Sequence, residues 1–324
     1  MKVIIPVAGV GSRLRPHTYS TSKVLLHVAG RTILSHVLEP VVRLNPEEII
    51  FVIGFKGEDV RRYIESTYSF KARFVHQEQL LGLGYALSLA LAEIDDGPLL
   101  ILLGDTIVET DLEKFVKAGE NVLALKGVDD PQRFGIAELK DGFVAGLEEK
   151  PTNPKTNLAI VGLYYFRDTR KLRSVLNEHV KSGNMTRGEI QFTDALQTMI
   201  QTGTKFLPFE VGEWLDCGKK ETVLATNRHL LNTKQQTARV EGSVVIPPVF
   251  VAEGASVKGS VLGPYVSISE GAVIENSVII DTIIGPFAKI SHAVLQDSLV
   301  GHHVTIHGVA KKVNVGDSSE IVIT

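Results

Sequence analysis

The sequence predicts an α/β domain with a mostly parallel central sheet, followed from residue 237 by a parallel β-helix of hexapeptide repeats. In the first part, short apolar runs alternate with helical patterns, which is typical of strands buried on both faces of a parallel sheet. After about residue 236 the helical pattern stops, and apolar residues recur every 16 positions. Repeats of this kind indicate coils that stack because no single coil can bury its own apolar row.

In the α/β part, residues 1–236, the apolar runs predict strands at 3–7, 48–54, 74–76 and 99–103. Helical patterns lie between them at 33–44, 58–68 and 86–94. Ligands bind at the carboxyl ends of the strands in such sheets. The glycine-rich loop after residue 7 and Asp105, which follows the strand at 99–103, are both expected at such ends.

In the second part, residues 237–324, three series of apolar residues predict the coils. The series are Ile246, Leu262, Val278 and Val294; then Ile268, Ile284 and Val300; and finally Ile274, Ile290 and Ile306. They predict about four coils. An irregular antiparallel β-domain is the alternative, but it does not explain three series in phase.

Composition narrows the classes of function. The chain has 324 residues, of which 44% are hydrophobic and 22% charged, and its formal net charge is -3. We therefore expect a soluble protein that does not bind nucleic acid, because sequence-independent binding needs a basic surface. The one cysteine, Cys217, cannot form a disulfide within the chain, which favours a reducing, cytoplasmic location. No stretch resembles a signal peptide or membrane span, so we expect no membrane partner.

The first chemical motif is the segment 8–16, AGVGSRLRP, followed by Lys23. Glycines allow the backbone to approach a phosphate, and loop N–H groups can surround its oxygens. Arg13 can hold two phosphate oxygens at once, and Lys23 adds a compact positive charge. A glycine loop alone is weak support, since it also serves as a tight turn; here an arginine and a lysine accompany it.

This segment resembles the G-x-G-[TS]-R-L-x-P signature of the sugar-nucleotide pyrophosphorylases, the sugar-1-phosphate nucleotidyltransferases. The resemblance continues along nearly the whole chain and is closest to long-form glucose-1-phosphate thymidylyltransferases, which carry a C-terminal left-handed β-helix. It implies a Rossmann-like nucleotidyltransferase domain. Further matching segments are Gln77 with Gly82-Leu83-Gly84, Leu103-Gly104-Asp105, Phe134-Gly135, Glu148-Glu149-Lys150-Pro151, Val161-Gly162-Leu163-Tyr164, Trp214-Leu215-Asp216-Cys217-Gly218 and the ending 315–321.

The resemblance assigns a role to each matching position. It implies catalytic roles for Arg13, Lys23 and Lys150, and Mg²⁺ ligands at Asp105 and Asp216. Nucleotide-binding residues would be Ala8, Gly9, Gly11, Ser12, Gln77 and Gly82. Sugar-binding residues would be Gly135, Glu149, Lys150 and Gly162.

Physical chemistry supports these roles. The reaction joins two anions, so positive charge must offset their repulsion, and positioning matters more than covalent chemistry. Mg²⁺ commonly takes one or two protein carboxylates together with substrate phosphates. Asp105 alone would more often be a turn or cap residue, and the charged run at 148–150 a solvated turn. The glycine loop and Asp216 in the same chain favour the site.

The predicted substrates are dTTP or UTP and a sugar 1-phosphate, with glucose 1-phosphate favoured. Gln79-Leu80-Leu81 replaces the prolines of short thymidylyltransferases, so the choice of base stays open. Alternatives are a related enzyme acting on mannose or amino-sugar phosphates, a bifunctional nucleotidyltransferase/acyltransferase, and a catalytically silent regulatory subunit. We expect the β-helix to mediate homo-oligomerisation. Four histidines there, His292, His302, His303 and His307, are expected to be exposed turn residues rather than a zinc site.

Overall fold

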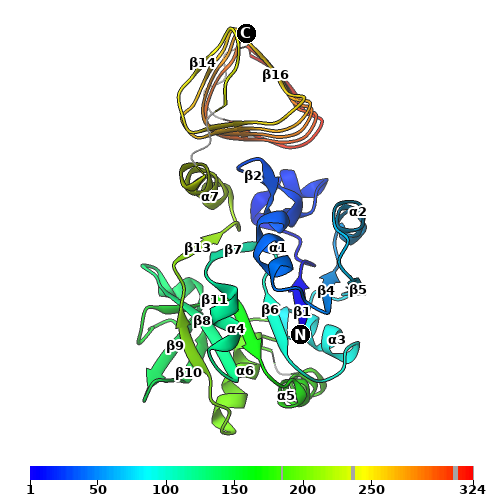
Figure 1. The fold of residues 1–324 in the computed structure, drawn as a ribbon, viewed down its shortest axis with the longest axis vertical. Coiled ribbons are helices and arrows are strands. Elements are labelled where there is room, and N and C mark those ends of the chain that lie inside the picture. The colour runs from blue at the N-terminus through cyan, green and yellow to red at the C-terminus, as the bar shows by residue number, and fades with distance from the viewer. Residues whose placement is uncertain (184, 235–237, 309–312, 324) are drawn as a thin grey trace. The chain divides into compact units, whose positions relative to one another are not determined.

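The computed structural model describes residues 1–183, 185–234, 238–308 and 313–323, and Figure 1 shows the fold. The chain forms two compact units. The sheet unit contains Met1–Gly9 and Val37–Trp214, and the β-helix unit contains Val10–His36 and Leu215–Thr324. The predicted domain boundary between residues 236 and 237 lies outside the described residues, so that division stays a prediction.

The sheet unit is built on a sheet with the strand order β10-β9-β11-β6-β1-β4-β5, in which β8 pairs with β11 and β12 pairs with β8. Strands β1, β4, β5 and β6 run parallel to one another, whereas β11 runs antiparallel to β6, β8 and β9. The α/β class and the parallel core of the sheet are thus confirmed. The strands are β1 (Lys2–Pro6), β4 (Glu48–Ile53), β5 (Ala72–His76), β6 (Leu99–Leu102), β8 (Asn121–Gly127), β9 (Gly135–Lys140), β10 (Phe143–Glu149), β11 (Leu158–Phe166) and β12 (Leu207–Glu210).

The core of this sheet is fully apolar. Ile4 of β1 pairs with Ile50 on one side and Ile101 on the other, and all three side chains are inaccessible to solvent. Leu87 and Phe192, from helices α3 and α6, belong to the same buried cluster. Continuous apolar strands are expected where helices cover both faces of a parallel sheet. The helices of the chain up to residue 201 are α1 (Ile33–Arg43), α2 (Gly57–Thr67), α3 (Leu83–Ala92), α4 (Leu112–Lys117), α5 (Arg170–Ser182) and α6 (Phe192–Gln201).

All four predicted strands and all three predicted helices before residue 105 are confirmed, with ends that differ by a few residues. The chain then forms β7 (Thr106–Glu109) and β13 (Glu213–Asp216), and the latter leads from the sheet unit into the β-helix unit.

The β-helix unit begins with a loop that contains three single-turn 3₁₀ helices, η1 (Ser12–Leu14), η2 (His17–Tyr19) and η3 (Lys23–Leu25). The hairpin of β2 (His27–Val28) and β3 (Arg31–Thr32) follows. The unit resumes with α7 (Lys220–Thr233) and the β-helix itself.

The β-helix stacks parallel strands, and Figure 1 shows its coils nearly end-on as a triangle. One face stacks five strands, β16, β19, β21, β23 and β25. This stacking agrees with the predicted left-handed helix of hexapeptide repeats. The strands are β14 (Val244–Val245), β15 (Val249–Val251), β16 (Ser256–Lys258), β17 (Val261–Leu262), β18 (Val266–Ile268), β19 (Val273–Glu275), β20 (Val278–Ile284), β21 (Lys289–Ser291), β22 (Val294–Val300), β23 (Thr305–Gly308), β24 (Asn314–Val315) and β25 (Glu320–Ile323).

Two of the three predicted apolar series are in register, but the first is wrong by one residue. Ile274, Ile290 and Ile306 are direct partners, and so are Ile268, Ile284 and Val300. In the first series, Val278 and Val294 are direct partners, but Leu262 pairs with Val245 and Ile279 instead of Ile246 and Val278.

The reason for this error is an additional residue in the early coils. Four steps separate Leu262 from Val266, whereas three separate Ile279 from Thr282, the partner position in the next coil. The additional residue lies in the turn 263–265. A shift of one residue in a strand exchanges inward and outward side chains. Accordingly Ile279 and Leu295 are buried, whereas Ile246 and Val294 are exposed.

A buried asparagine joins the two stretches of the β-helix unit. Asn227 of α7 is inaccessible to solvent. Its Oδ1 accepts hydrogen bonds from the backbone N–H of Ala29 (2.8 Å) and from the hydroxyl of Ser267 (2.7 Å). Its Nδ2 donates to the carbonyl of Tyr265 over 3.2 Å. One side chain therefore links the hairpin, α7 and the β-helix.

We predict that Asn227→Ala strongly destabilises the protein. The substitution leaves buried partners such as the N–H of Ala29 without a hydrogen bond, and each such group costs about 1–3 kcal/mol. Differential scanning calorimetry should record a melting temperature several degrees lower, since about 2–4 °C is lost per kcal/mol in domains of this size. Asn232→Ala, on the exposed side of the same helix, is the matched control. Equal melting temperatures for both variants would contradict the role of Asn227.

Candidate active site

The loop after β1 carries the predicted catalytic cations. Gly11 has a φ of 66°, a left-handed conformation that suits glycine. Its carbonyl accepts the N–H of Leu14 (2.9 Å), which closes η1, and also the hydroxyl of Thr18 (2.9 Å). A Cβ at Gly11 would lie 3.0 Å from the Cβ of Lys23. The lysine stem thus packs against the glycine, and Lys23 is 8% exposed.

Arg13 and Asp216 meet at Gly218. A Cβ at Gly218 would lie 2.9 Å from Nη2 of Arg13 and 2.9 Å from Oδ1 of Asp216. The guanidinium and the carboxylate therefore share one small space, which only a residue without a side chain leaves open. Arg13 itself is exposed at the first 3₁₀ turn. This group brings a predicted phosphate-binding cation and a predicted metal ligand together in the β-helix unit.

In the sheet unit, Ala8 and Gly9 extend β1. The N–H of Val7 donates to the carbonyl of Val52 (2.8 Å), so the pairing with β4 continues beyond the end of β1. Ala8 is buried, and a Cβ at Gly54 would lie 2.9 Å from its methyl carbon. A larger residue than alanine would crowd this point. Gly9 is exposed.

Asp105 is the last of the three residues that connect β6 to β7, and it is half-buried. Its Oδ1 accepts the hydroxyl of Thr106 over 3.3 Å. Asp216 is the last residue of β13 and is also half-buried. Hard oxygen ligands at strand ends that solvent reaches suit Mg²⁺, which keeps several waters and shares substrate oxygens. Among the described residues there is no cluster of three or more histidine, cysteine, aspartate or glutamate side chains able to enclose a metal by itself.

The predicted sugar-binding residues Glu149 and Lys150 form a hydrogen-bonded cluster. Lys150 Nζ lies 3.3 Å from Glu149 Oε1, and their side chains are 42% and 11% exposed. Thr193 donates its hydroxyl to Glu149 Oε2 over 2.6 Å. Lys150 has a φ of 47°, which is rare for a residue with a side chain. Its N–H donates to the carbonyl of Phe134 (3.0 Å), and Arg187 donates to its carbonyl (2.8 Å).

Gly135 and Gly162 lie beside this cluster and beside β6, respectively. A Cβ at Gly135 would approach Glu149 Oε2 to 3.0 Å. Gly162 has a φ of 84°, and a Cβ there would lie 2.5 Å from Leu103. At both glycines the space that a side chain would need is taken up by neighbouring atoms, so each glycine allows two segments to lie close together.

Gln77 and Gly82 lie next to each other. Gln77 is 5% exposed, and its Nε2 donates to the carbonyl of Gly82 over 3.4 Å. Gly82 precedes α3, and the strand-like contact between Ile190 and Leu81 (N–H to carbonyl, 2.7 Å) fixes its loop. The structure thus brings together the two residues predicted to bind the base.

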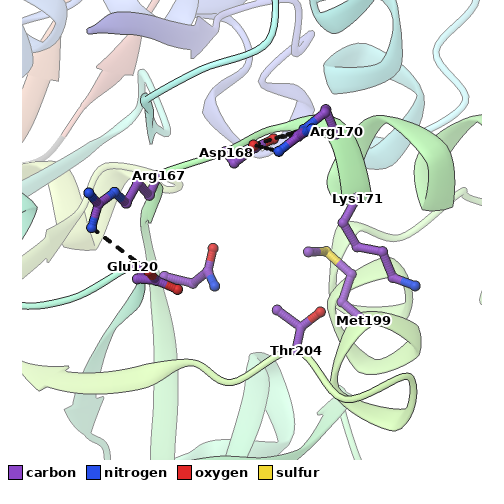
Figure 2. A pocket seen from close by; sticks show the side chains of 8 residues that line it. Glu120, Arg167, Asp168, Arg170, Lys171, Met199 and Thr204 are labelled. Carbon is purple, nitrogen blue, oxygen red and sulfur yellow. Dashed lines mark hydrogen bonds and ion pairs between the residues drawn. The ribbon is translucent and has the colours of Figure 1, made fainter.

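A pocket of about 520 Å³ elsewhere in the sheet unit contains none of the predicted residues. Figure 2 shows that its arginines point at carboxylates: Arg170 Nε lies 2.8 Å from Asp168, and Arg167 lies 3.7 Å from Glu120. Asp168 and Glu120 therefore compensate the positive charges of the two arginines. The pocket is lined by Glu120, Asn121, Arg167, Asp168, Arg170, Lys171, Met199 and Thr204.

Two residues that contact the Glu149–Lys150 cluster were not predicted from the sequence. Thr193, at the start of α6, and Arg187 act on the Glu149–Lys150 cluster from parts of the chain about 40 residues away, and no local pattern marks them.

Trp214 packs edge-to-face on Phe134 (4.7 Å between ring centres). Its buried Nε1 has no hydrogen-bond partner in the described part of the chain. Tyr164 is buried. Burial and the negative charge of Glu149 raise the pKa of Tyr164, so its hydroxyl stays neutral.

Burial also shifts the histidines of the β-helix unit. Desolvation lowers the pKa of His27 to about 4, and His302 and His36 contribute through their charge. The rings of His27 and His302 are 6.2 Å apart. Burial likewise lowers the pKa of His17 and of His302. The prediction of exposed turn residues is confirmed for His292 and His303. His307 is exposed but lies in strand β23, and His302 lies in a turn but is half-buried.

An α/β sheet whose first strand ends in a glycine loop with nearby cations defines a class of proteins that bind phosphate groups. Within this class, the chain belongs to the nucleotidyl transferase family, whose model matches residues 2–233. A second model, the GlmU-like C-terminal hexapeptide domain, matches residues 232–310. The resemblance found in the sequence is confirmed.

Similar proteins include a glucose-1-phosphate thymidylyltransferase of Streptomyces antibioticus, 32% identical over 79% of this chain and 74% of the relative. The bifunctional protein GlmU of Methanocaldococcus jannaschii is 34% identical over 79% of this chain but only 61% of its own length. A UDP-glucose pyrophosphorylase solved with UDP-glucose has a TM-score of 0.63 at 22% identity, over 72% of this chain and 98% of its own. This last similarity supports the fold. Within the described residues, no helix has the length and apolar character needed to cross a bilayer.

We predict that the protein loses stability as the pH falls from about 6.5 to 4. The folded state lowers the pKa of His27 to about 4, whereas an unfolded histidine titrates near 6.5. In this window the unfolded chain binds a proton that the folded chain does not, so stability rises with pH and is complete above it. In urea denaturation, His27→Leu should flatten the dependence of the free energy of unfolding on pH, by up to about 1.4 kcal/mol per pH unit. The exposed His76→Leu should leave the slope unchanged; equal slopes for wild type and His27→Leu would contradict the prediction.

Proposed function

We propose that this protein transfers a nucleotidyl group from dTTP or UTP to a sugar 1-phosphate, with glucose 1-phosphate as the favoured acceptor. The observation that carries the proposal is the group formed by Arg13, Asp216 and Gly218. It places a phosphate-binding cation beside a carboxylate suited to Mg²⁺, in a chain of the nucleotidyl transferase family.

In the proposed reaction, a phosphate oxygen of the sugar 1-phosphate attacks the α-phosphorus of the triphosphate. A new P–O bond forms, the bond from the α-phosphorus to the bridging oxygen of the β-phosphate breaks, and pyrophosphate leaves. No general base is required, because the attacking oxygen is already ionised at neutral pH. Catalysis then depends on bringing two anions together and on stabilising the charge of the leaving pyrophosphate.

The cationic loop would stabilise the charge of the leaving pyrophosphate. Arg13 can donate two parallel hydrogen bonds to the phosphates as negative charge moves to the leaving group. Lys23, whose stem is fixed against Gly11, would neutralise a further charge. Ala8, Gly9, Gly11 and Ser12 would let the backbone approach the triphosphate.

The cluster at Lys150 would bring the anionic sugar phosphate to the anionic triphosphate. Its ammonium group would hold the sugar phosphate, and Glu149 would accept hydrogen bonds from sugar hydroxyls. Thr193 holds one carboxylate oxygen of Glu149, which leaves the orientation of the carboxylate defined before substrate binds. Gly135 and Gly162 would leave room for the sugar ring.

Asp105 and Asp216 would hold Mg²⁺, which neutralises phosphate charge when bound. Gln77 would pair with the base, since its amide offers both a donor and an acceptor. Relatives named as thymidylyltransferase and as bifunctional GlmU support nucleotidyl transfer without deciding between dTTP and UTP. A silent regulatory subunit is disfavoured because Arg13 and Asp216 are both present.

The β-helix would mediate self-association. Its exposed apolar side chains include Val244, Phe287 and Val322, which are 58%, 47% and 60% exposed. Sedimentation velocity at micromolar concentration should reveal an oligomer, and a monomer would refute this assignment.

The proposal is tested by measuring pyrophosphate release for a grid of sugar 1-phosphates against dTTP, UTP, GTP, ATP and CTP. We expect release that requires Mg²⁺, stops with EDTA and is fastest with dTTP or UTP. No release from any pair by folded protein would favour the regulatory subunit.

We predict that Asp216→Asn lowers kcat by about 100-fold or more, the loss typical of removing one group that stabilises the transition state. Rates should be measured at saturating Mg²⁺, where weaker metal binding alone would be compensated. Glu213→Gln, at the exposed start of the same strand, is the control and should retain activity. Equal rates for the two variants would remove Asp216 from the mechanism.

We also predict that Thr193→Val raises the KM for the sugar 1-phosphate about five- to tenfold and leaves the KM for the triphosphate within twofold. A net contribution of about 1–1.4 kcal/mol from this hydrogen bond corresponds to this factor. Thr198→Val, on the same helix, is the control. A larger effect on the triphosphate would contradict the placement of Glu149 at the sugar.

A further inference from the structure

The last described coil of the β-helix contacts the phosphate-binding loop directly. We refer to Asn314, Gly316 and Asp317 as the terminal clamp. The carboxamide oxygen of Asn314 accepts a hydrogen bond from Nε2 of His17 over 2.6 Å. This ring is 2% exposed, although nearly 300 residues separate the two partners along the chain.

Asp317 divides its two carboxylate oxygens between the loop and the β-helix. Oδ2 accepts the hydroxyl of Thr21 over 3.1 Å and also the hydroxyl of Ser20. Oδ1 accepts the backbone N–H of His302 over 2.7 Å, which ties the carboxylate to the preceding coil. The clamp is thus bonded to the preceding coil on one side and to the loop on the other.

Gly316 makes the approach of these segments possible. A Cβ at this position would lie 3.0 Å from the Cβ of Pro16. Any side chain would therefore press on the residue that begins η2. All three clamp residues lie against the segment 16–21, so the contact consists of several interactions rather than a single bond.

The held segment connects in turn to the catalytic part of the loop. Thr18, within η2, donates its hydroxyl to the carbonyl of Gly11. Gly11 begins η1, which contains Arg13, and it packs on Lys23 at the start of η3. A path of direct contacts therefore runs from the clamp through η2 to both cations.

This loop needs external support. Single-turn 3₁₀ helices have poor hydrogen-bond geometry and little stability of their own. Fixing backbone residues on ligand binding costs conformational entropy. A loop that is ordered beforehand binds its ligand more tightly, since this cost is met in folding.

We propose that Asn314 and Asp317 are positioning residues for nucleotidyl transfer, which hold η2 so that Arg13 and Lys23 are ordered for the triphosphate. The β-helix then contributes to the catalytic reaction itself, in addition to any role in self-association. This inference rests on the proposed function, and it assigns the triphosphate, not the sugar phosphate, as the substrate whose binding depends on the clamp.

The test compares Asn314→Ala and Asp317→Ala with Asn314→Asp, which keeps an oxygen acceptor for His17. Thr21→Val removes one bond from the side of the loop. Arg228→Gln is the matched control, because Arg228 anchors α7 to the β-helix through Asp281 (2.7 Å) without touching the clamp. Circular dichroism establishes that each variant is folded.

In steady-state kinetics with Mg²⁺, we expect the two alanine variants to raise the KM for dTTP or UTP about tenfold, with the KM for the sugar 1-phosphate within twofold. Asn314→Asp should restore most of the affinity, and Thr21→Val should show a smaller rise. Equal changes in both KM values, or the same change in Arg228→Gln, would reduce the clamp to a general structural role and overturn the proposal.

Hydrogen–deuterium exchange separates this inference from the proposed function. The N–H groups of Leu14, Tyr19 and Thr21 are bonded within the loop, and they should exchange faster in Asn314→Ala than in the wild type or Arg228→Gln. If wild type releases no pyrophosphate while this difference is found, the proposed function fails and the positioning by the clamp stands. Unchanged exchange in an active enzyme overturns the positioning alone.

Discussion

The buried carboxamide of Asn227 joins stretches of chain that lie almost 200 residues apart in sequence, and the β-helix unit depends on it. A polar group without contact to water must find its hydrogen bonds within the protein. Asn227 finds them on Ala29, Tyr265 and Ser267, so one side chain joins its helix, the early hairpin and the first coils. The N-terminal loop is thereby part of a unit formed mainly by the C-terminal third of the chain.

This arrangement has a consequence for the chemistry. Positive charges that bind a triphosphate repel one another before the ligand arrives, and they must nevertheless be ordered. In this protein the loop with Arg13 and Lys23 is supported by glycine-mediated packing at Gly11, and the segment that follows is held by the β-helix. The sheet unit supplies a different set of groups, in which Glu149 is oriented by Thr193 and carries the charge of Lys150 beside it.

The sequence was most informative where a local pattern reflects a local cause. Continuous apolar runs located the buried strands of the sheet before residue 105. The repeat of the β-helix was visible, but its first apolar series was displaced by one residue. The turn at 263–265 contains an additional residue, and a period read from sequence letters cannot tell a longer turn from a shifted strand.

Contacts between distant parts of the chain could not be predicted in this way. Thr193 and Arg187 are ordinary residues in their local context, and only the folded chain brings them to Glu149 and Lys150. His302 was expected to be exposed because of its place in a turn of the β-helix, yet it lies close to His27. The burial of His302 results from the packing of the N-terminal loop on the last coils. The periodicity of the sequence does not reveal this contact.

The most direct test of the account follows the oxygen atoms of the acceptor. Glucose 1-phosphate carrying ¹⁸O at its non-bridging phosphate oxygens is incubated with dTTP or UTP, Mg²⁺ and the protein, and the products are analysed by mass spectrometry. Attack on the α-phosphorus predicts a nucleotide sugar that retains the whole label and pyrophosphate that contains none. Label in the pyrophosphate, or pyrophosphate release with all the label left in unreacted sugar phosphate, would contradict nucleotidyl transfer.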